Sequence, residues 1–274
     1  MLLRALARAP LAEVSRLVGR AADARVPSAL RAPLYRAFAA AVGADLRECP
    51  APLSEFPTFD AFFTRRLPTG ARRWPSARAT AGSPVDGVVG RFGVVERGAA
   101  LQAKDRPYAV ADLLGSAAAG ARFRGGAYLT LYLAPRHYHR VHAPVGGRIA
   151  ATTHLSGLLL PVNPPSVATV HRLFATNERT VCLLETDVGA AAVVAVGATN
   201  VGRIAVPAVP GWDPAQTVDV ERVHRPPIPI DRGDELMVFH LGSTVIVLFE
   251  GRRLIGGLRR GAEIRLGDPI AEPA

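Results

Sequence analysis

Hydrophobic and polar positions change their spacing about a quarter of the way along the chain. In the first twenty residues, apolar side chains recur every three or four positions with arginines between them, which is typical of an amphipathic helix. Prolines then divide the chain up to residue 60 into short helices, and we predict the last of these over residues 58–66. The apolar positions are Leu2, Leu3, Leu6, Leu11, Val14, Leu17 and Val18, and the arginines are Arg4, Arg8, Arg16 and Arg20.

From residue 83 onward the pattern is different, with short apolar runs separated by Gly, Pro and Asp, as in β-strands. The turn Asp187-Val188-Gly189 lies between two such runs and predicts a hairpin. The chain is therefore predicted to have an α+β fold, with a helical region over residues 1–75 and a β-rich domain over residues 76–274. The predicted strands are 85–95, 127–133, 180–185, 191–196 and 236–249.

The net charge points to an anionic partner. The chain has 33 Lys and Arg against 23 Asp and Glu, a formal net charge of +10. Nucleic acid is one such partner, but the arginines are spread along the chain without a zinc-finger or aromatic RNA-binding motif. An anionic membrane surface is favoured, because basic and apolar positions alternate along the first predicted helix. Packing of this helix on its own domain and an organellar transit peptide remain alternatives.

Other features of the composition narrow the class of protein. With 49% hydrophobic and 20% charged residues, the chain is expected to fold around a core rather than to be disordered or a coiled coil. No stretch approaches the roughly 18 to 20 consecutive apolar residues of a membrane-spanning helix, so membrane association would be peripheral. Cys49 and Cys182 are too few for a disulfide framework, which favours a reducing compartment. Lys104 is the only lysine, and this bias indicates a GC-rich coding sequence.

Three polar clusters are candidates for chemistry. His137, His139 and His142 lie within six positions and could bind a metal, form a hydrogen-bonded loop, or act as general acids and bases. Asp86, between a proline turn and Gly87, is typical of an Asx turn but could also orient a histidine. Ser243 follows Gly242 ahead of an apolar run, where it could form a turn or attack the unshielded carbonyl of Gly242.

Together, these clusters resemble the signature blocks of the phosphatidylserine decarboxylase family. The resemblance covers about residues 55 to 250, and residues 241–244 (Leu-Gly-Ser-Thr) are similar to the self-cleavage motif of the family. Each block alone is weak, but the combination and order are specific. The other matching blocks are residues 62–67, 83–87, 138–142, 173–179 and 196–202.

The resemblance implies a proenzyme that cuts itself between Gly242 and Ser243. Ser243 would attack the Gly242 carbonyl to give an ester in place of the peptide bond, and elimination would release residues 1–242 as the large β subunit. The serine remnant would hydrolyse to a pyruvoyl group at the start of a small α subunit, residues 243–274, and the catalytic domain over residues 76–274 would contain parts of both subunits. By the same resemblance Asp86, His142 and Ser243 form the self-cleavage triad, with His142 as base and Asp86 as its orienting partner. His139 is the implied proton donor in decarboxylation.

The implied reaction is decarboxylation of phosphatidylserine to phosphatidylethanolamine and carbon dioxide. It would proceed through a Schiff base with the pyruvoyl group, a covalent cofactor derived from Ser243, and no metal is expected. The implied location is peripheral, on the cytoplasmic face of a bacterial cell membrane, rather than in an organelle, and the implied assembly is a dimer of processed heterodimers that binds no nucleic acid. His137 departs from the family, which has an acidic residue there.

Two other classes remain possible from the residues alone. The first is a metal-dependent hydrolase built on His137, His139 and His142, which would contain stoichiometric zinc. The second is a non-catalytic membrane- or nucleic-acid-binding module, which would stay uncut and bind its partner in a salt-sensitive way.

Overall fold

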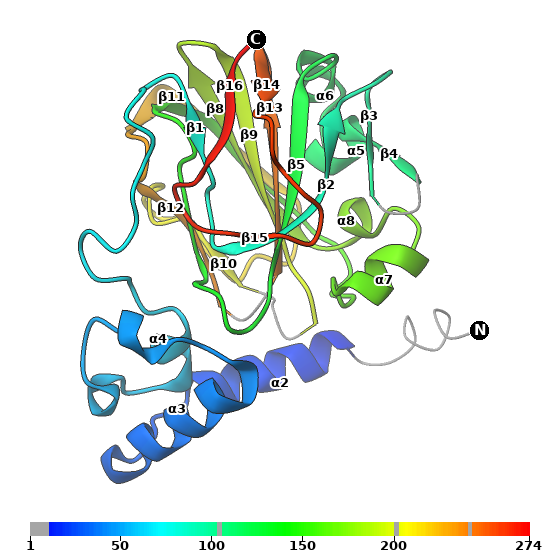
Figure 1. The fold of residues 1–274 in the computed structure, drawn as a ribbon. Coiled ribbons are helices and arrows are strands. Elements are labelled where there is room, and N and C mark those ends of the chain that lie inside the picture. Colours follow the sequence, from blue (N-terminus) through cyan, green and yellow to red (C-terminus); the bar gives the residue numbers. More distant parts are fainter. Residues whose placement is uncertain (1–10, 103–105, 200–202, 241–242) are drawn as a thin grey trace.

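A computed structural model describes residues 11–102, 106–199, 203–240 and 243–274 (Figure 1). The predicted amphipathic stretch is therefore described only from residue 11; positions 2, 3, 4, 6 and 8, and the side chains of residues 11–16, lie outside the described part. None of the described helices is long and apolar enough to cross a bilayer. The N-terminal layer consists of α2 (Leu11–Asp23), α3 (Ser28–Val42), α4 (Phe59–Phe63) and the 3-10 turns η1 (Leu46–Glu48) and η2 (Leu53–Glu55).

Aromatic side chains hold this helical layer together. Tyr35 and Phe62 are fully buried and stack with ring centroids 4.6 Å apart, and the Tyr35 hydroxyl donates to the Phe56 carbonyl at 3.1 Å. Helix α4 begins where the hydroxyl of Thr58 accepts the Ala61 N–H, a standard N-cap. It ends at Phe63, earlier than predicted, and the Phe63 ring lies 4.1 Å from the His139 ring. Helix α4 thus joins the helical layer to the histidine segment.

The main sheet has eight strands, and every pairing in it is antiparallel. Strand β13 lies inside it, hydrogen-bonded to β9 on one side and β5 on the other. All its side chains from residue 245 to residue 249 are fully buried. In sheet order the strands are β11 (Val220–Ile230), β7 (Gly147–Leu155), β8 (Arg179–Thr186), β9 (Gly189–Val196), β13 (Ser243–Phe249), β5 (Ala127–Leu133), β2 (Gly87–Val94) and β15 (Glu263–Ile264).

Smaller elements complete a mixed fold that is mostly strand, as the α+β prediction stated. In Figure 1 the short helices lie to one side of the main sheet, above the N-terminal helices. A three-stranded sheet contains β10 (Ile204–Ala205), β12 (Glu235–Phe239) and β6 (Arg140–His142); a second contains β1 (Ala81–Gly82), β16 (Pro269–Pro273) and β14 (Arg252–Leu254); β3 (Ala99–Leu101) pairs with β4 (Pro107–Ala109); and the helices are α5 (Val110–Leu114), α6 (Ala117–Arg122), α7 (Pro164–Thr169) and α8 (Leu173–Thr176).

Most predicted strands are found, but one prediction is wrong. The apolar run 236–249 is not a single strand; it forms β12 and β13, which belong to different sheets. The hairpin prediction is confirmed, since β8 and β9 are joined through Asp187 and Val188, and Gly189 has the positive φ of 74° that favours glycine. The division of the chain into domains at residue 75 stays a prediction.

Candidate active site

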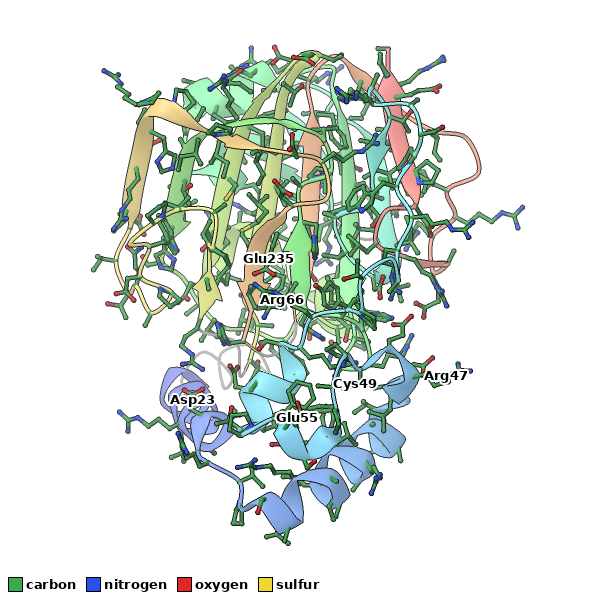
Figure 2. All side chains as sticks on the ribbon, turned by 90° about the vertical axis from the view of Figure 1, so that its left-hand side faces the viewer. Asp23, Arg47, Cys49, Glu55, Arg66 and Glu235 are labelled. Atoms are coloured by element: carbon green, nitrogen blue, oxygen red, sulfur yellow. The ribbon has the colours of Figure 1, made fainter. Side chains whose placement is uncertain are left out.

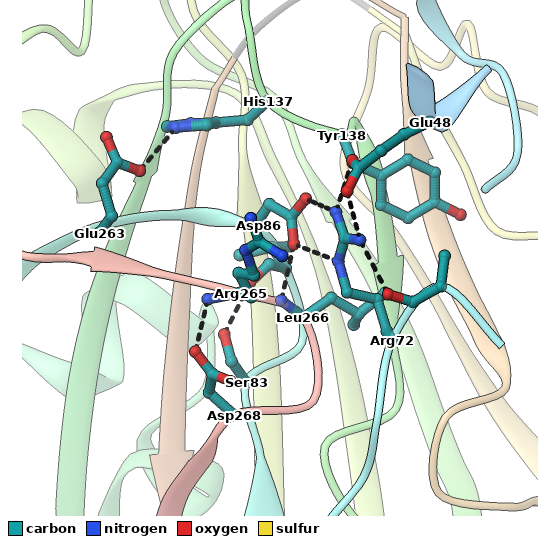
Figure 3. Close-up of polar contacts among 12 residues, drawn as sticks. Glu48, Arg72, Ser83, Asp86, His137, Tyr138, Glu263, Arg265, Leu266 and Asp268 are labelled. Carbon is teal, nitrogen blue, oxygen red and sulfur yellow. Dashed lines mark hydrogen bonds and ion pairs between the residues drawn. The ribbon is translucent and has the colours of Figure 1, made fainter. Parts of the chain in front are cut away.

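Asp86 lies just before β2 and is held by a buried arginine. Its carboxylate accepts the Nε and Nη2 hydrogens of Arg72 at 3.0 and 2.5 Å, and the backbone N–H of Leu266 at 2.7 Å. Arg72 also donates two hydrogen bonds to Glu48, both at 2.8 Å. Figure 3 shows the Arg72 guanidinium between the two carboxylates. One cation therefore bridges two carboxylates, of which Glu48 comes from the helical layer.

Replacing Arg72 with methionine is expected to lower the free energy of unfolding by about 3–5 kcal/mol, because two carboxylates would lose their shared cation. The side chains of Arg72 and Asp86 are only 7% and 11% exposed. Arg253 is the matched control, since its pair with Glu272 is 69% and 44% exposed and its replacement by methionine should cost less than about 1 kcal/mol. Urea unfolding followed by circular dichroism measures both, and equal losses would contradict the expectation.

His142 has a defined tautomer. Its Nδ1 lies 2.7 Å from the carbonyl oxygen of Gly233, which can only accept, so Nδ1 carries the proton. Nε2 then accepts the hydroxyl proton of Tyr138 at 3.0 Å. Burial is the main cause that lowers the pKa of His142, which favours the neutral ring. The nitrogen that could act as a base is therefore Nε2, and Tyr138 occupies it.

The predicted contact between Asp86 and His142 is not present: within the described part of the chain, no hydrogen bond or ion pair joins the two side chains. Their backbones are close, because the N–H of His142 donates to the carbonyl of Pro84 at 2.9 Å. The carboxylate of Asp86 turns to Arg72 instead, and the Gly233 carbonyl holds the His142 proton. The role of Asp86 toward His142 stays a prediction.

His139 is fully buried and keeps one nitrogen open. Its Nδ1–H donates to the His137 carbonyl at 2.8 Å, and Nε2 has no hydrogen-bond partner among the described residues. Burial lowers the pKa of His139 to about 3, so the ring is neutral at pH 7. A buried nitrogen lone pair without a donor is costly. Such an atom is a candidate for contact with a bound reactant.

His139 and His142 are each paired with a residue of β12. The partner of His139 is closer in the sequence to the start of β13 than the partner of His142 is. The Phe239 N–H donates to the His139 carbonyl at 3.0 Å, four residues before Ser243, whereas His142 is paired with Glu235, eight residues before it. Ser243 is the first residue of β13 and is paired with Leu133, at the end of β5. Leu133 is therefore paired with Ser243 itself, and His139, at the other end of the segment 133–139, is bonded to a residue four positions before Ser243 in the chain. The side chain of Ser243 and all of Gly242 lie outside the described residues.

Glu235 and Arg140 link β6 to the helical layer through ion pairs and a hydrogen bond. Glu235 accepts Arg140 Nη1 at 2.5 Å and Arg66 Nε at 3.3 Å, and Arg140 Nε donates to the Thr64 carbonyl at 2.7 Å. Figure 2 shows Glu235 and Arg66 where the sheets meet the helices. These contacts hold Arg140, which lies two residues before His142 on β6.

The histidine cluster does not have the geometry of a metal site. His137 Nδ1 accepts the Ala134 N–H at 2.9 Å, so its Nε2–H donates to Glu263 at 3.0 Å, and both ring nitrogens are used. His142 is likewise engaged at both nitrogens. Over the described ranges, no group of three or more His, Cys, Asp and Glu side chains is placed to hold a metal ion.

Several residues of this site were missed by reasoning from the sequence. Arg72 contacts Asp86, Glu48 contacts Arg72, and Gly233 contacts His142. No spacing in the sequence identifies these three residues. Tyr138 was within a signature block, but its hydrogen bond to His142 depends on how that loop is folded.

Comparison with known proteins covers this whole region. A family model described as "Phosphatidylserine decarboxylase" matches residues 59–272. The phosphatidylserine decarboxylase proenzyme of Anaeromyxobacter sp. (strain K) is 46% identical over 279 residues, which cover 100% of this chain and 99% of that protein. The proenzyme of Myxococcus xanthus (strain DK1622) is 42% identical over 267 residues, covering 95% of this chain and 94% of that protein.

Proposed function

The chain belongs to the phosphatidylserine decarboxylase family, which converts phosphatidylserine to phosphatidylethanolamine and carbon dioxide, and we propose that the residues described above perform this reaction after self-cleavage. The proenzyme names of its relatives fit a chain that is processed into subunits and acts on a lipid. A metal-dependent hydrolase and a non-catalytic binding module are not supported by these similarities.

In the proposed self-cleavage, the Ser243 hydroxyl attacks the carbonyl of Gly242 and His142 accepts its proton at Nε2. The Gly242–Ser243 C–N bond breaks as an ester forms, and elimination then releases residues 1–242 with a new carboxylate. Hydrolysis of the dehydroalanine left at position 243 gives the pyruvoyl group and ammonia. The Gly233 carbonyl keeps the other ring proton of His142 on Nδ1, which leaves Nε2 as the basic atom. Because Nε2 accepts the Tyr138 hydroxyl at rest, this hydrogen bond must exchange before His142 can act. Asp86 is held by Arg72, and the carbonyl of Pro84, two residues before Asp86, accepts the backbone N–H of His142, so the proposed role of Asp86 is to support the position of His142.

One observation carries the proposal: Ser243 begins a buried strand that is paired on both sides. Cleavage before Ser243 would leave β13 fixed between β9 and β5, so a new N-terminal group would stay in place. The surroundings fit a pyruvoyl group, because Leu133, which is paired with Ser243, begins the segment that contains His139. The Nε2 atom of His139 has no hydrogen-bond partner among the described residues. A pyruvoyl group supplies an acceptor for the electrons that a departing carboxylate leaves behind.

His139 is the proposed proton donor to the α-carbon of the substrate. Since its ring is neutral at pH 7 and Nδ1 already donates to the His137 carbonyl, Nε2 must first accept a proton before it can donate one. The buried position excludes water as a competing partner. His139 therefore acts as a carrier of one proton.

Membrane association of the helical layer is also part of the proposal. Leu17 on α2 is 66% exposed, and Leu30 and Leu34 on α3 are 57% and 44% exposed. Leu30 and Leu34 are four residues apart and share one helix face. These apolar side chains, with the positive net charge, suit peripheral binding to the cytoplasmic face of a bacterial membrane. We further expect a dimer of processed heterodimers.

The intact mass of the purified protein tests the proposal. We expect two species, one of which is a fragment of residues 243–274 with a blocked N-terminus, because conversion of Ser243 removes its amino group. Release of carbon dioxide from phosphatidylserine should accompany the fragment. A chain that stays at its full 29.0 kDa would contradict the proposal.

A further inference from the structure

The segment Asn177, Glu178 and Arg179, at the start of β8, has one member whose side chain the fold does not use. The Asn177 side chain is buried and bonds to both backbone groups of Leu160 and to the Gly197 carbonyl, at 2.8 to 3.2 Å. Both side chains beside Glu178 therefore stabilise the fold, because the side chain of Arg179 also forms hydrogen bonds to the backbone. Its guanidinium donates to the carbonyls of Leu113, Asn177 and Asp112 at 2.6 to 2.9 Å.

Glu178 differs from both neighbours. Its backbone is fixed, since its N–H donates to the Leu158 carbonyl and its carbonyl accepts the Gly197 N–H, both at 2.8 Å. Its half-buried carboxylate makes no hydrogen bond or ion pair with any residue in the described part of the chain. Burial raises its pKa to about 7, and no charged side chain contributes to the shift. A carboxylate held without a partner is costly unless a ligand supplies one.

The register of the sheet places Glu178 beside the start of β13. Arg179 is paired with Val196, and Val196 is paired with Thr244. The hydrogen bond from Gly197 to Glu178 extends this ladder by one residue, into the row of Ser243. With strands about 4.8 Å apart, two strand spacings put the backbones of Glu178 and Ser243 about 10 Å apart. A headgroup bound at Ser243 would lie within reach of this carboxylate.

We propose that Glu178 binds the amino group of the phosphoserine headgroup and accepts the proton that this group must lose before it can react with a carbonyl. The transfer converts an ammonium and a carboxylate into an amine and a carboxylic acid, with no other reactant. The assignment rests on the function proposed above. Leu158 and Gly197, which hold the backbone of Glu178, carry no titratable group that would compete for this proton.

Glu178→Gln tests the assignment, because it keeps the shape of the side chain and removes the basic oxygen. The variant should be cut to the 243–274 fragment as completely as the unmodified chain. Its kcat/KM for phosphatidylserine in detergent micelles should fall about 100-fold, at the lower end of the range for a lost acid–base group. The unmodified enzyme should show a fall of kcat/KM below pH 7, because Glu178 must be deprotonated to accept the proton. This fall should disappear in Glu178→Gln and be retained in Glu178→Asp.

A binding measurement separates recognition from turnover. By calorimetry, the processed enzyme should prefer glycerophosphoethanolamine to glycerophosphoglycerol, which lacks the amine, and Glu178→Gln should lose this preference. Glu185→Gln is the matched control, because Glu185 lies on the same strand and pairs with Arg122 at 2.6 Å. It should change neither the pH profile nor the preference for the amine.

Two results would overturn the assignment. The first is a fully cut Glu178→Gln enzyme with the original pH profile. The second is a Glu178→Gln chain that melts at a lower temperature and is not cut, since Glu178 would then have a structural role. Failure of the unmodified chain to be cut would instead contradict the proposed function.

Discussion

A chain with Ser243 replaced by alanine is expected to remain at full length and to release no carbon dioxide from phosphatidylserine. The Ser243 hydroxyl is both the proposed nucleophile of self-cleavage and the source of the carbonyl needed for decarboxylation, so its loss removes both steps. Intact mass and carbon dioxide release measure the two effects. The effect should be complete, because a methyl group can neither attack a carbonyl nor be converted to one.

Thr130→Val is the matched control for Ser243→Ala. Thr130 lies on β5, outside the self-cleavage motif, is 5% exposed, and its hydroxyl has no hydrogen-bond partner within the described ranges. Removing a buried, unpaired hydroxyl should leave stability unchanged or increased, and the chain should still be cut. Cleavage of the Ser243→Ala chain at the same bond would show that another group is the nucleophile.

Replacing His139 and His142 singly with alanine is expected to separate self-cleavage from decarboxylation. His142→Ala should leave the chain uncut, because the base for the Ser243 hydroxyl is lost. His139→Ala should be cut, yet decarboxylate about 100- to 10 000-fold more slowly, because the buried nitrogen that carries the proton is gone. Cleavage is measured by mass and decarboxylation per mole of cut enzyme.

His154→Ala controls for the loss of a buried histidine in general. His154 is 3% exposed and also has an unpartnered Nε2 as far as the described residues extend, but it lies on β7, outside the segment that meets β13. This variant should be both cut and active. A His139→Ala enzyme with full activity would remove His139 from the reaction, and an uncut His139→Ala chain would instead give it a part in cleavage.

The sequence predicted those parts of the fold that depend on local pattern. Strand β5 and the hairpin at Gly189 follow from an apolar run and from turn residues, so they were found at nearly the correct positions. The run 236–249 was misread as one strand, because its apolar residues continue past the point where the chain passes from one sheet to another. Strand β11 contains three prolines in eleven residues, which hid it from a search for strand-forming residues.

In the candidate site, too, the sequence predicts what depends on local pattern and not what depends on the tertiary fold. Asp86, His139 and His142 are predicted as site residues because they lie in segments with a specific resemblance to a family, and their roles stay predictions. Their partners could not be found in this way, because Arg72 reaches Asp86 and Gly233 reaches His142 only through the tertiary fold. Glu178 lay in a recognised block, but only the structure separates it from Asn177 and Arg179, whose side chains are fully engaged.

The position of β13 inside the main sheet determines how the protein would behave on dilution after the proposed cleavage. The strand lies between β9 and β5, and five consecutive side chains, from Val245 to Phe249, are fully buried, each contributing roughly 1.5–3 kcal/mol. The two pieces would therefore not separate as ordinary subunits do, through the parting of preformed surfaces, because the smaller one could leave only if the sheet unfolded. The proposed cleavage would thus convert one polypeptide into an obligate pair that dissociates at the rate at which the sheet unfolds, independent of protein concentration.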